Sequence, residues 1–262
     1  MAATVQEIKQ MLLQANDESF TVLERSLSAD TRKGVRIAVE STRRRLEAQR
    51  AEIARLDGLY SFQESIAKEH GGRVVLGLDE VGRGSIAGPS AVGGVVLPDE
   101  PHIQGLNDSK QLSPAKREEI ADQVRQTAIA WTVQYVEPDV IDSIGMTASL
   151  RRAFSSAIAQ IEKAGIEVDV VLLDGNPMHL DKREVNVIKG DARCASIAAA
   201  SIVAKVERDA LMTRYAVEYP QYDLEDCKGY GSAKHIAAIK QHGLSPIHRA
   251  SFCTSFMQES LF

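Results

Sequence analysis

Residues 73–84 read RVVLGLDEVGRG, an apolar run that ends in two acidic residues and a glycine-rich turn. A continuous run of Val and Leu is typical of a strand that is buried on both faces of a sheet. A charged side chain at the end of such a strand is costly unless it is paired, hydrated or bound to a metal ion. Asp79 and Glu80 therefore mark a candidate site at the end of a central strand.

A second buried strand is predicted at 168–173, and it also ends in an acid, Asp174. A further acid, Asp191, precedes a long helix expected over 196–217, whose N-terminus favours an ionised carboxylate. Sites in open α/β sheets gather at strand ends. Carboxylate oxygens suit Mg²⁺ or Mn²⁺ rather than zinc, and paired ions can direct water at a phosphodiester. The predicted catalytic and metal-binding residues are Asp79, Glu80, Asp174 and Asp191.

These acids have a structural alternative, because carboxylates often end strands and helices without any catalytic role. Asp79 and Glu80 also point to opposite faces of a regular strand. If both serve one site, we expect the pleat to break at Glu80, which Gly82 and Gly84 would permit.

Strands and helices alternate after residue 72, which predicts an α/β domain over residues 73–262. Apolar runs and alternation place strands at 74–78, 91–97, 131–136, 168–173 and 184–188. Helices are expected from Pro114, with Ser113 as the N-cap, and over 147–164, 196–217 and 232–241.

Residues 1–72 are predicted to form an all-helical extension, with a boundary near Gly71-Gly72. Helices are expected at 4–15, around Phe20–Leu23, and from an Asp30 N-cap towards Ala67. The long helix carries an apolar seam that can pair within the chain or between chains, formed by Val39, Leu46, Ile53 and Tyr60. We expect a monomer. A second face is either solvated or in contact with phosphates, and it carries Arg36, Arg43 and Arg50.

The composition is that of an ordinary globular protein, with 44% hydrophobic and 26% charged residues. The three cysteines lie far apart and form no C-x-x-C pair, which predicts reduced thiols in a cytoplasmic protein. We find neither a signal sequence nor an apolar run long enough to cross a bilayer, so we expect no membrane association. Because the net charge is −5, any surface for nucleic acid must be local.

Three other enzyme classes are disfavoured by absent motifs. There is no G-x-x-x-x-G-K-[ST] loop for a nucleotide triphosphatase and no G-x-S-x-G turn for a serine hydrolase. The pair Gly82-x-Gly84 does not begin a dinucleotide-binding loop, because the spacing to Gly88 is wrong and Pro89 follows.

The series of motifs over 73–252 resembles bacterial ribonuclease HII. The matching segments, in the order of that family, are DEVGRG at 79–84 with AGP at 87–89, NDSK at 107–110, LDG at 173–175, KGD at 189–191, SIAAASIVAKVERD at 196–209, KGYG at 228–231, His235, and PIHR at 246–249 with Ser251-Phe252. Each motif is moderately specific, and the whole series is highly specific. The N-terminal extension is similar to that of only some bacterial members.

The resemblance implies an RNase H-like fold, with a central mixed five-stranded sheet flanked by helices. It implies a metal-dependent endonuclease that cleaves RNA in RNA–DNA hybrids and nicks DNA on the 5′ side of embedded ribonucleotides. The products would carry 3′-hydroxyl and 5′-phosphate ends. Asp79, Glu80, Asp174 and Asp191 match the acids that bind Mn²⁺ or Mg²⁺ in this family.

The same resemblance assigns substrate contacts. The turn Gly82-Arg83-Gly84 matches the element that reads the junction between ribonucleotide and DNA, and Tyr230 matches the aromatic residue that stacks there. For Tyr230 the alternative is a core tyrosine. The expected phosphate contacts are Lys110, Lys189, Arg193, Lys205 and Lys228, any of which can instead be ordinary surface charge.

Two alternatives stay open. Ribonuclease HIII shares the fold but carries Lys where Arg83 stands and has a different N-terminal domain. A non-catalytic nucleic-acid-binding protein on the same fold would use the arginine-rich helix instead, although the presence of all four acids argues against lost catalysis.

The last five residues, QESLF at 258–262, are similar to the short motif that binds the bacterial sliding clamp. Gln258, Leu261 and Phe262 would dock in an apolar groove of the clamp, with Leu-Phe as the anchor. The alternative is that Leu261 and Phe262 pack on the protein itself.

Overall fold

The computed structural model describes residues 3–257 and divides into two compact units, Met1–Asp57 and Gly58–Phe262. The division falls within the long helix α3 (Lys33–Glu69), rather than at Gly71-Gly72 where the composition changes. The last part of α3 belongs with the sheet because Tyr60 stacks on His102 and Gln63 accepts a hydrogen bond from the amide of Ser196.

The N-terminal unit consists of α1 (Val5–Gln14), α2 (Asp17–Ser26) and the first part of α3. Its core contains Ile8, Leu12 and Phe20 from the short helices, packed with Val35 and Leu46. These contacts cover the first half of the predicted apolar seam within the chain. Ile53 is 48% exposed and does not belong to this core.

The start of α3 differs from the expectation. The helix begins at Lys33, not at an Asp30 N-cap, because the Asp30 carboxylate binds the backbone amide and the guanidinium of Arg32. Thr4 and Asn16 cap α1 and α2, each through a reciprocal pair of hydrogen bonds with the residue three positions later.

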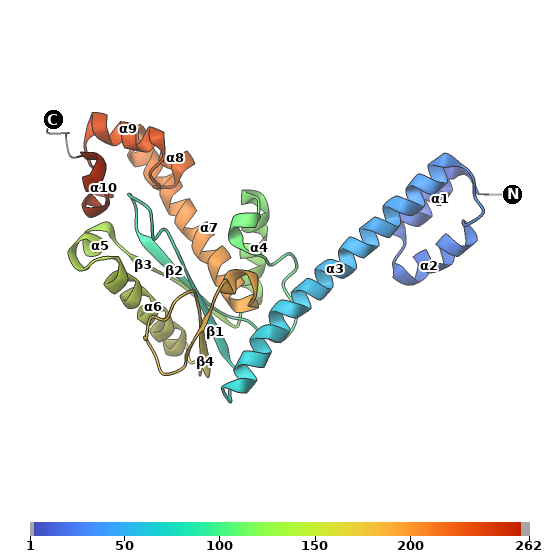
Figure 1. Cartoon of the computed structure of the whole chain (residues 1–262), viewed down its shortest axis with the longest axis horizontal. Helices are drawn as coiled ribbons and strands as arrows, with labels where there is room; N and C mark the ends of the chain where they lie inside the picture. The colour runs from blue at the N-terminus through green and yellow to red at the C-terminus, as the bar shows by residue number, and fades with distance from the viewer. Residues whose placement is uncertain (1–2, 258–262) are drawn as a thin grey trace. The chain divides into compact units, whose positions relative to one another are not determined.

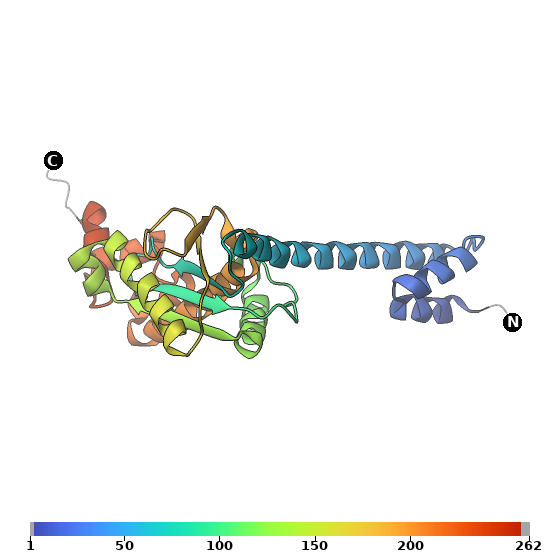
Figure 2. The same ribbon diagram turned by 90° about the horizontal axis from the view of Figure 1, so that it is seen from below.

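The second unit is built on a five-stranded mixed sheet, as predicted, and the strand order is β3-β2-β1-β4-β5. The strands are β1 (Val75–Val81), β2 (Ser90–Val96), β3 (Ala130–Val136), β4 (Val170–Asp174) and β5 (Glu184–Val187). β1 pairs antiparallel with β2, and β2 with β3, whereas β1–β4 and β4–β5 are parallel. Figure 1 shows the central position of β1, and Figure 2 gives the perpendicular view.

Helices cover both faces of this sheet (Figure 1). One face packs on α6 (Met146–Lys163), where Leu76 and Leu78 join Leu150 and Phe154 in one core. The other face packs on α7 (Ala195–Glu218), with α4 (Pro114–Thr127) beside it. α7 lies close to the sheet, because a Cβ added to Gly77 would come within 2.3 Å of the Ser196 backbone.

The remaining elements are short or terminal. The helices α5 (Pro138–Ile144), α8 (Leu224–Cys227) and α10 (Ala250–Met257) were not predicted individually, whereas α9 (Ala233–His242) was. The described residues also include three short 3-10 turns, η1 (Ser109–Gln111), η2 (Gly190–Ala192) and η3 (Pro220–Tyr222).

The three cysteines are free thiols, as the sequence predicts. Among residues 3–257, no helix has the length and apolar character needed to cross a membrane.

Candidate active site

The strand β1 keeps its regular pairing through both acids. Asp79 lies opposite Gly93 and Glu80 opposite Val92, so the expected break of the pleat at Glu80 is wrong. The two carboxylates therefore leave the strand on opposite faces. Hydrogen bonding from Ser201 on α7 lowers the pKa of Asp79, while Glu80 lines a cavity with Leu150 and Phe154 on α6.

The end of β4 leaves the edge of β1 unpaired beside these carboxylates. Pairing between β1 and β4 extends only to Leu78 opposite Leu173, and β4 ends at Asp174. Asp79 and Glu80 of β1 therefore have no paired residue on β4. Asp174 raises the pKa of both acids by charge repulsion, which places the three carboxylates in one electrostatic site.

Asp174 and Asp191 are brought together by the turn between β5 and α7. The amide of Gly190 donates to Oδ1 of Asp174 at 2.6 Å, and Asp191 is the next residue. A Cβ on Gly190 would lie 3.2 Å from the same oxygen and 2.6 Å from Ile197, so a larger residue would disturb this turn. All four predicted acids thus lie at one end of the sheet.

The acids carry unfavourable charge in this arrangement. Burial raises the pKa of Asp79, which is only 6% exposed, well above its usual value, and Glu80 and Asp174 raise it further. Burial is also the first cause that raises the pKa of Glu80 and of Asp174. A bound cation would offset both burial and repulsion.

Within residues 3–257, no three His, Cys, Asp or Glu side chains converge closely enough to hold a metal ion as they stand. The four acids nevertheless suit a hard divalent cation. They all lie at one end of the sheet, and carboxylate oxygens are ligands that Mg²⁺ and Mn²⁺ prefer. To coordinate an ion, the side chains of Asp79 and Glu80, on opposite faces of β1, and that of Asp191 in η2 would have to rotate toward it.

The 107–110 loop contributes a cation and a hydroxyl to the site. Nζ of Lys110 lies 3.4 Å from Oδ2 of Asp191. Burial by itself would lower the pKa of Lys110, but Asp191, Asp108 and Asp79 together raise it. The hydroxyl of Ser109 lies 3.0 Å from that of Ser201, and hydrogen bonding from Ser201 lowers the pKa of Asp79.

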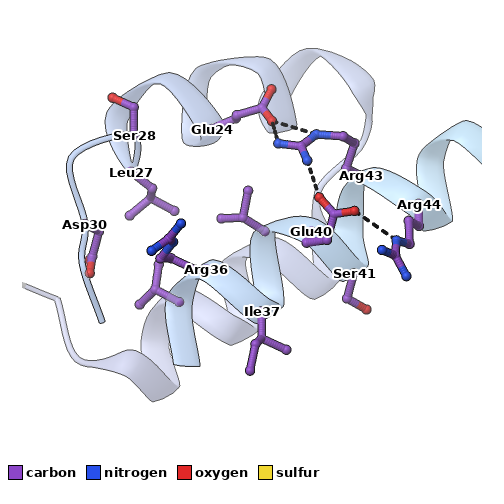
Figure 3. A pocket seen from close by; sticks show the side chains of 12 residues that line it. Glu24, Leu27, Ser28, Asp30, Arg36, Ile37, Glu40, Ser41, Arg43 and Arg44 are labelled. Carbon is purple, nitrogen blue, oxygen red and sulfur yellow. Dashed lines mark hydrogen bonds and ion pairs between the residues drawn. The ribbon is translucent and has the colours of Figure 1, made fainter. Parts of the chain in front are cut away.

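A cavity of about 290 Å³ opens beside Glu80 and Asp174. Its lining includes Arg83 and Asn176 along with apolar side chains of α6. Arg83 is exposed, and its guanidinium lies 3.5 Å from the carboxylate of Glu80. A larger cavity, of about 750 Å³, belongs to the N-terminal unit and includes none of the four acids (Figure 3). There Arg43 bridges Glu24 and Glu40.

Two buried arginines hold the turn Gly82-Arg83-Gly84 and the residues that follow it. Arg208 on α7 donates to the carbonyls of Pro89 and Ala87 and to the hydroxyl of Ser85. Arg249 donates to the carbonyls of Arg83 and Gly88. Gly82 has φ +79°, and a Cβ there would meet Nε of Arg208 at 2.2 Å, so this position requires glycine.

Tyr230 lies in the neighbouring 228–231 loop and is 39% exposed, so it is not a core tyrosine. The loop joins the preceding segment because the carbonyl of Gly229 accepts from the amides of Ile86 and Ala87. The guanidinium of Arg208 lies 5.5 Å from the centre of the Tyr230 ring. The carbonyl of Tyr230 is 2.9 Å from Nδ1 of His235.

The remaining predicted phosphate contacts have different surroundings. Lys189 is exposed, and Lys228 binds the hydroxyl of Thr213. Arg193 stacks on Phe62 with its guanidinium 4.4 Å from the ring centre. Lys205 pairs with Asp209 at 2.8 Å and lies 5.9 Å from the Tyr230 ring. Gln258, Leu261 and Phe262 lie outside the described residues.

Sequence reasoning did not identify Ser201, Arg208 or Arg249 as site residues. A signal for Arg208 existed, since helical spacing places it on the buried stripe of α7 between Ala204 and Met212. Arg249 has no such signal. His235 and His248 were assigned no chemistry, and both are buried and bonded to each other at 3.1 Å.

Comparisons with known proteins agree with this geometry. A family model described as ribonuclease HII matches residues 76–255, and one described as ribonuclease HII N-terminal domain matches residues 4–67. A ribonuclease HII of Listeria monocytogenes is 38% identical over 252 residues, which cover 96% of this chain and 95% of that protein.

Two solved structures share the fold of the second unit. The ribonuclease HII of Archaeoglobus fulgidus, solved in a complex with PCNA, is 26% identical with a TM-score of 0.60, covering 71% of this chain and 98% of that one. The ribonuclease H2 of Pyrococcus horikoshii OT3 is 25% identical with a TM-score of 0.58, covering 71% of this chain and 100% of that one.

These matches confirm the expected RNase H-like fold and extend to the N-terminal helices. Both family models that match are those of ribonuclease HII, which favours it over the HIII alternative. The chain belongs to the ribonuclease HII family.

Proposed function

We propose that this member of the ribonuclease HII family is a metal-dependent endoribonuclease whose catalytic residues are Asp79, Glu80, Asp174 and Asp191. It cleaves RNA in RNA–DNA hybrids and nicks duplex DNA on the 5′ side of an embedded ribonucleotide. The observation that carries the proposal is the position of these four acids at one end of the sheet, next to the Gly82–Gly84 turn.

The residues of the chain divide the work between ion binding and substrate alignment. The four acids would hold Mg²⁺ or Mn²⁺, which supplies a strongly polarised water and charge stabilisation at the scissile phosphate when bound. Ser201 orients the Asp79 carboxylate from α7, and the Gly190 amide orients that of Asp174. Lys110 balances the negative charge at Asp191 and is a cation available to a substrate phosphate.

Recognition of the ribonucleotide falls to the turn Gly82-Arg83-Gly84 and to Tyr230. Gly84 is exposed, and a Cβ added there would meet nothing within 4 Å, so no internal contact explains a glycine at this position. A close approach by the sugar with its 2′-hydroxyl would explain it. The exposed ring of Tyr230 offers a stacking surface.

Phosphates along the bound duplex would be met by Lys110, Lys189, Arg193 and Lys205. Among these, Lys189 is the most available, because it is exposed and forms no ion pair within the described residues. Arg193 and Lys205 would have to share contacts with Phe62 and Asp209.

Two statements concern partners. We infer that the tail residues Gln258, Leu261 and Phe262 bind the bacterial sliding clamp, as the complex of the Archaeoglobus relative with PCNA suggests for that protein. We also infer that the chain acts as a monomer, since α1 and α2 cover Val35 and Leu46 within the same chain.

The function is tested with a duplex that carries one ribonucleotide in one DNA strand. We expect a single nick 5′ to that ribonucleotide, with 3′-hydroxyl and 5′-phosphate ends, in Mg²⁺ or Mn²⁺ and none in EDTA. Mass analysis of both fragments identifies the ends. Nicking that survives EDTA, or ends of the opposite kind, would refute the proposal.

A further inference from the structure

Arg208 and Arg249 are fully buried, and neither forms an ion pair within residues 3–257. Buried arginines are normally matched by a carboxylate, because burial of an unpaired charge is costly. Here the partners are backbone carbonyls and one hydroxyl, all from segments 83–89 and 228. Burial lowers the pKa of Arg249 to about 9, which leaves it charged at neutral pH.

Arg249 fixes the direction of one peptide group in the Gly82–Gly84 turn. Its guanidinium donates to the carbonyl of Arg83 at 3.0 Å. In a planar trans peptide the C=O and the following N–H point in opposite directions. The amide of Gly84 therefore points away from Arg249, and it makes no hydrogen bond within the described residues. It is a free donor on the exposed side of the turn.

Arg208 joins the turn segment to the loop that carries Tyr230. Its Nε and one terminal nitrogen bind Pro89 and Ser85, at 2.9 and 2.7 Å. Its other terminal nitrogen donates to the carbonyl of Lys228 at 2.9 Å. One planar group thus sets the spacing between two segments that are far apart in the sequence.

The same face of α7 also reaches the acids. Ser201, Lys205 and Arg208 recur at helical spacing, so their side chains leave one side of the helix. Hydrogen bonding from Ser201 lowers the pKa of Asp79, and Arg208 binds both loops. α7 therefore connects the catalytic carboxylate to the residues that choose the cutting position.

We propose that Arg208 is a positioning residue for site selection: it holds the Gly82–Gly84 turn and Tyr230 at the spacing that places one particular phosphodiester at the acids. The inference rests on the proposed function, in which these two segments read the ribonucleotide. Arg208 does not touch the reacting atoms, so its effect must appear in the choice of substrate more than in hydrolysis itself.

The substitution Arg208→Lys separates geometry from charge. Lysine keeps the positive charge but has one point of donation, whereas the arginine fork spans both segments. A loosened spacing is tolerated on a continuous RNA–DNA hybrid, where neighbouring phosphates are also cleavable. It is not tolerated on a duplex with one ribonucleotide, where only one phosphate qualifies, and small displacements can cost about 100-fold in rate.

The experiment measures kcat/KM on these two substrates, matched in sequence, for the wild type, Arg208→Lys and Ser85→Ala. Ser85→Ala removes one bond of Arg208 without removing a charge. The control is Arg183→Lys, because Arg183 also donates to a backbone carbonyl, that of Val168, outside both loops. Circular dichroism sets a temperature at which every variant is folded.

We expect Arg208→Lys to lose at least about 10-fold more activity on the single-ribonucleotide duplex than on the hybrid. Ser85→Ala should change the ratio of kcat/KM on the two substrates in the same direction but by less. The cut positions mapped on the hybrid should spread over more phosphodiesters. Arg183→Lys should leave the ratio unchanged. An equal loss on both substrates, or no loss, overturns the positioning role. Failure of the wild type to nick the single-ribonucleotide duplex overturns the proposed function as well.

Discussion

The hydroxyl of Ser201 on α7 lies 3.0 Å from the hydroxyl of Ser109, and hydrogen bonding from Ser201 lowers the pKa of Asp79 on β1. This contact spans the interface between helix and sheet, where Gly77 and small residues of α7 permit close packing. An acid that we propose to be catalytic thus interacts with an uncharged residue of α7.

Replacement of Ser201 by Ala should lower kcat about 10-fold and the free energy of unfolding by about 1 kcal/mol, because the buried hydroxyl that bonds Ser109 and lowers the pKa of Asp79 is lost. The matched control is Ser149→Ala, since the buried Ser149 hydroxyl on α6 has no hydrogen-bond partner. That variant should be as stable as the wild type or more so. Urea unfolding measures the stability of the two variants, and single-turnover nicking measures their activity. Equal effects of the two variants would contradict an orienting role for Ser201.

Lys110→Met should weaken substrate binding without much loss of stability. Its side chain is 79% exposed, so the ion pair with Asp191 contributes less than about 1 kcal/mol. Loss of one phosphate contact should reduce the slope of log affinity against log salt concentration by about one in magnitude. Fluorescence anisotropy with a labelled hybrid, in EDTA and at several salt concentrations, measures this slope. Lys116→Met is the control, because Lys116 pairs with Glu119 on the exposed surface, and an identical slope change in both variants would contradict the assignment.

The buried pair His235 and His248 predicts a loss of stability in acid. Burial, reinforced by His235, lowers the pKa of His248 to about 4. The groups that face it are His235, the ring of Tyr222 and Ser245, with Arg249 next in sequence. An unfolded histidine titrates near about 6.5. Between these values the unfolded chain binds a proton that the folded chain does not, so stability rises with pH across this window.

From pH 7 to pH 4.5 this histidine should therefore remove roughly 2–3 kcal/mol of unfolding free energy. Urea unfolding of the wild type and of His248→Asn at both pH values isolates its contribution, because the variant lacks the group. His70→Gln, at an exposed position, should retain the wild-type dependence. If His248→Asn kept the full pH dependence of stability as well, a neutral buried His248 in the folded protein would be ruled out.

Much of the second unit was predictable because its strands are continuous apolar runs and its long helices have clear periodicity. The apolar runs that end at Asp79 and Asp174 predicted the strands β1 and β4 and two of the candidate site acids. The short helix α8 has four residues and α5 has seven, too few for a periodic signal. The position of Glu80 was harder, because its place in the site depends on where the neighbouring strand β4 ends.

The arginine contacts could not be predicted for a different reason. Arg208 reaches Ser85, 123 residues earlier, and Arg249 reaches Gly88, 161 residues earlier. Their partners are mainly backbone carbonyls, which every residue carries, so side-chain types give no indication of the pairing. Only the folded chain shows that both guanidinium groups face the same loop.

Deletion of residues 258–262 should reduce binding to the bacterial sliding clamp at least about 10-fold, because Leu261 and Phe262 would supply the apolar anchor. Surface plasmon resonance with immobilised clamp measures this. Nicking of a short duplex without clamp should stay at the wild-type level. Equal clamp binding by the full and shortened chains would exclude the tail as the docking segment.

The most direct measurement is nicking of a duplex with one embedded ribonucleotide by Asp79→Asn, with Asp122→Asn as the control at an exposed helix position. We expect Asp79→Asn to lose at least about 10³-fold in kcat. Its thermal stability should equal or exceed that of the wild type, because a buried carboxyl with a raised pKa is removed. Asp122→Asn should retain full activity. Wild-type nicking by a folded Asp79→Asn protein would contradict the carboxylate metal site.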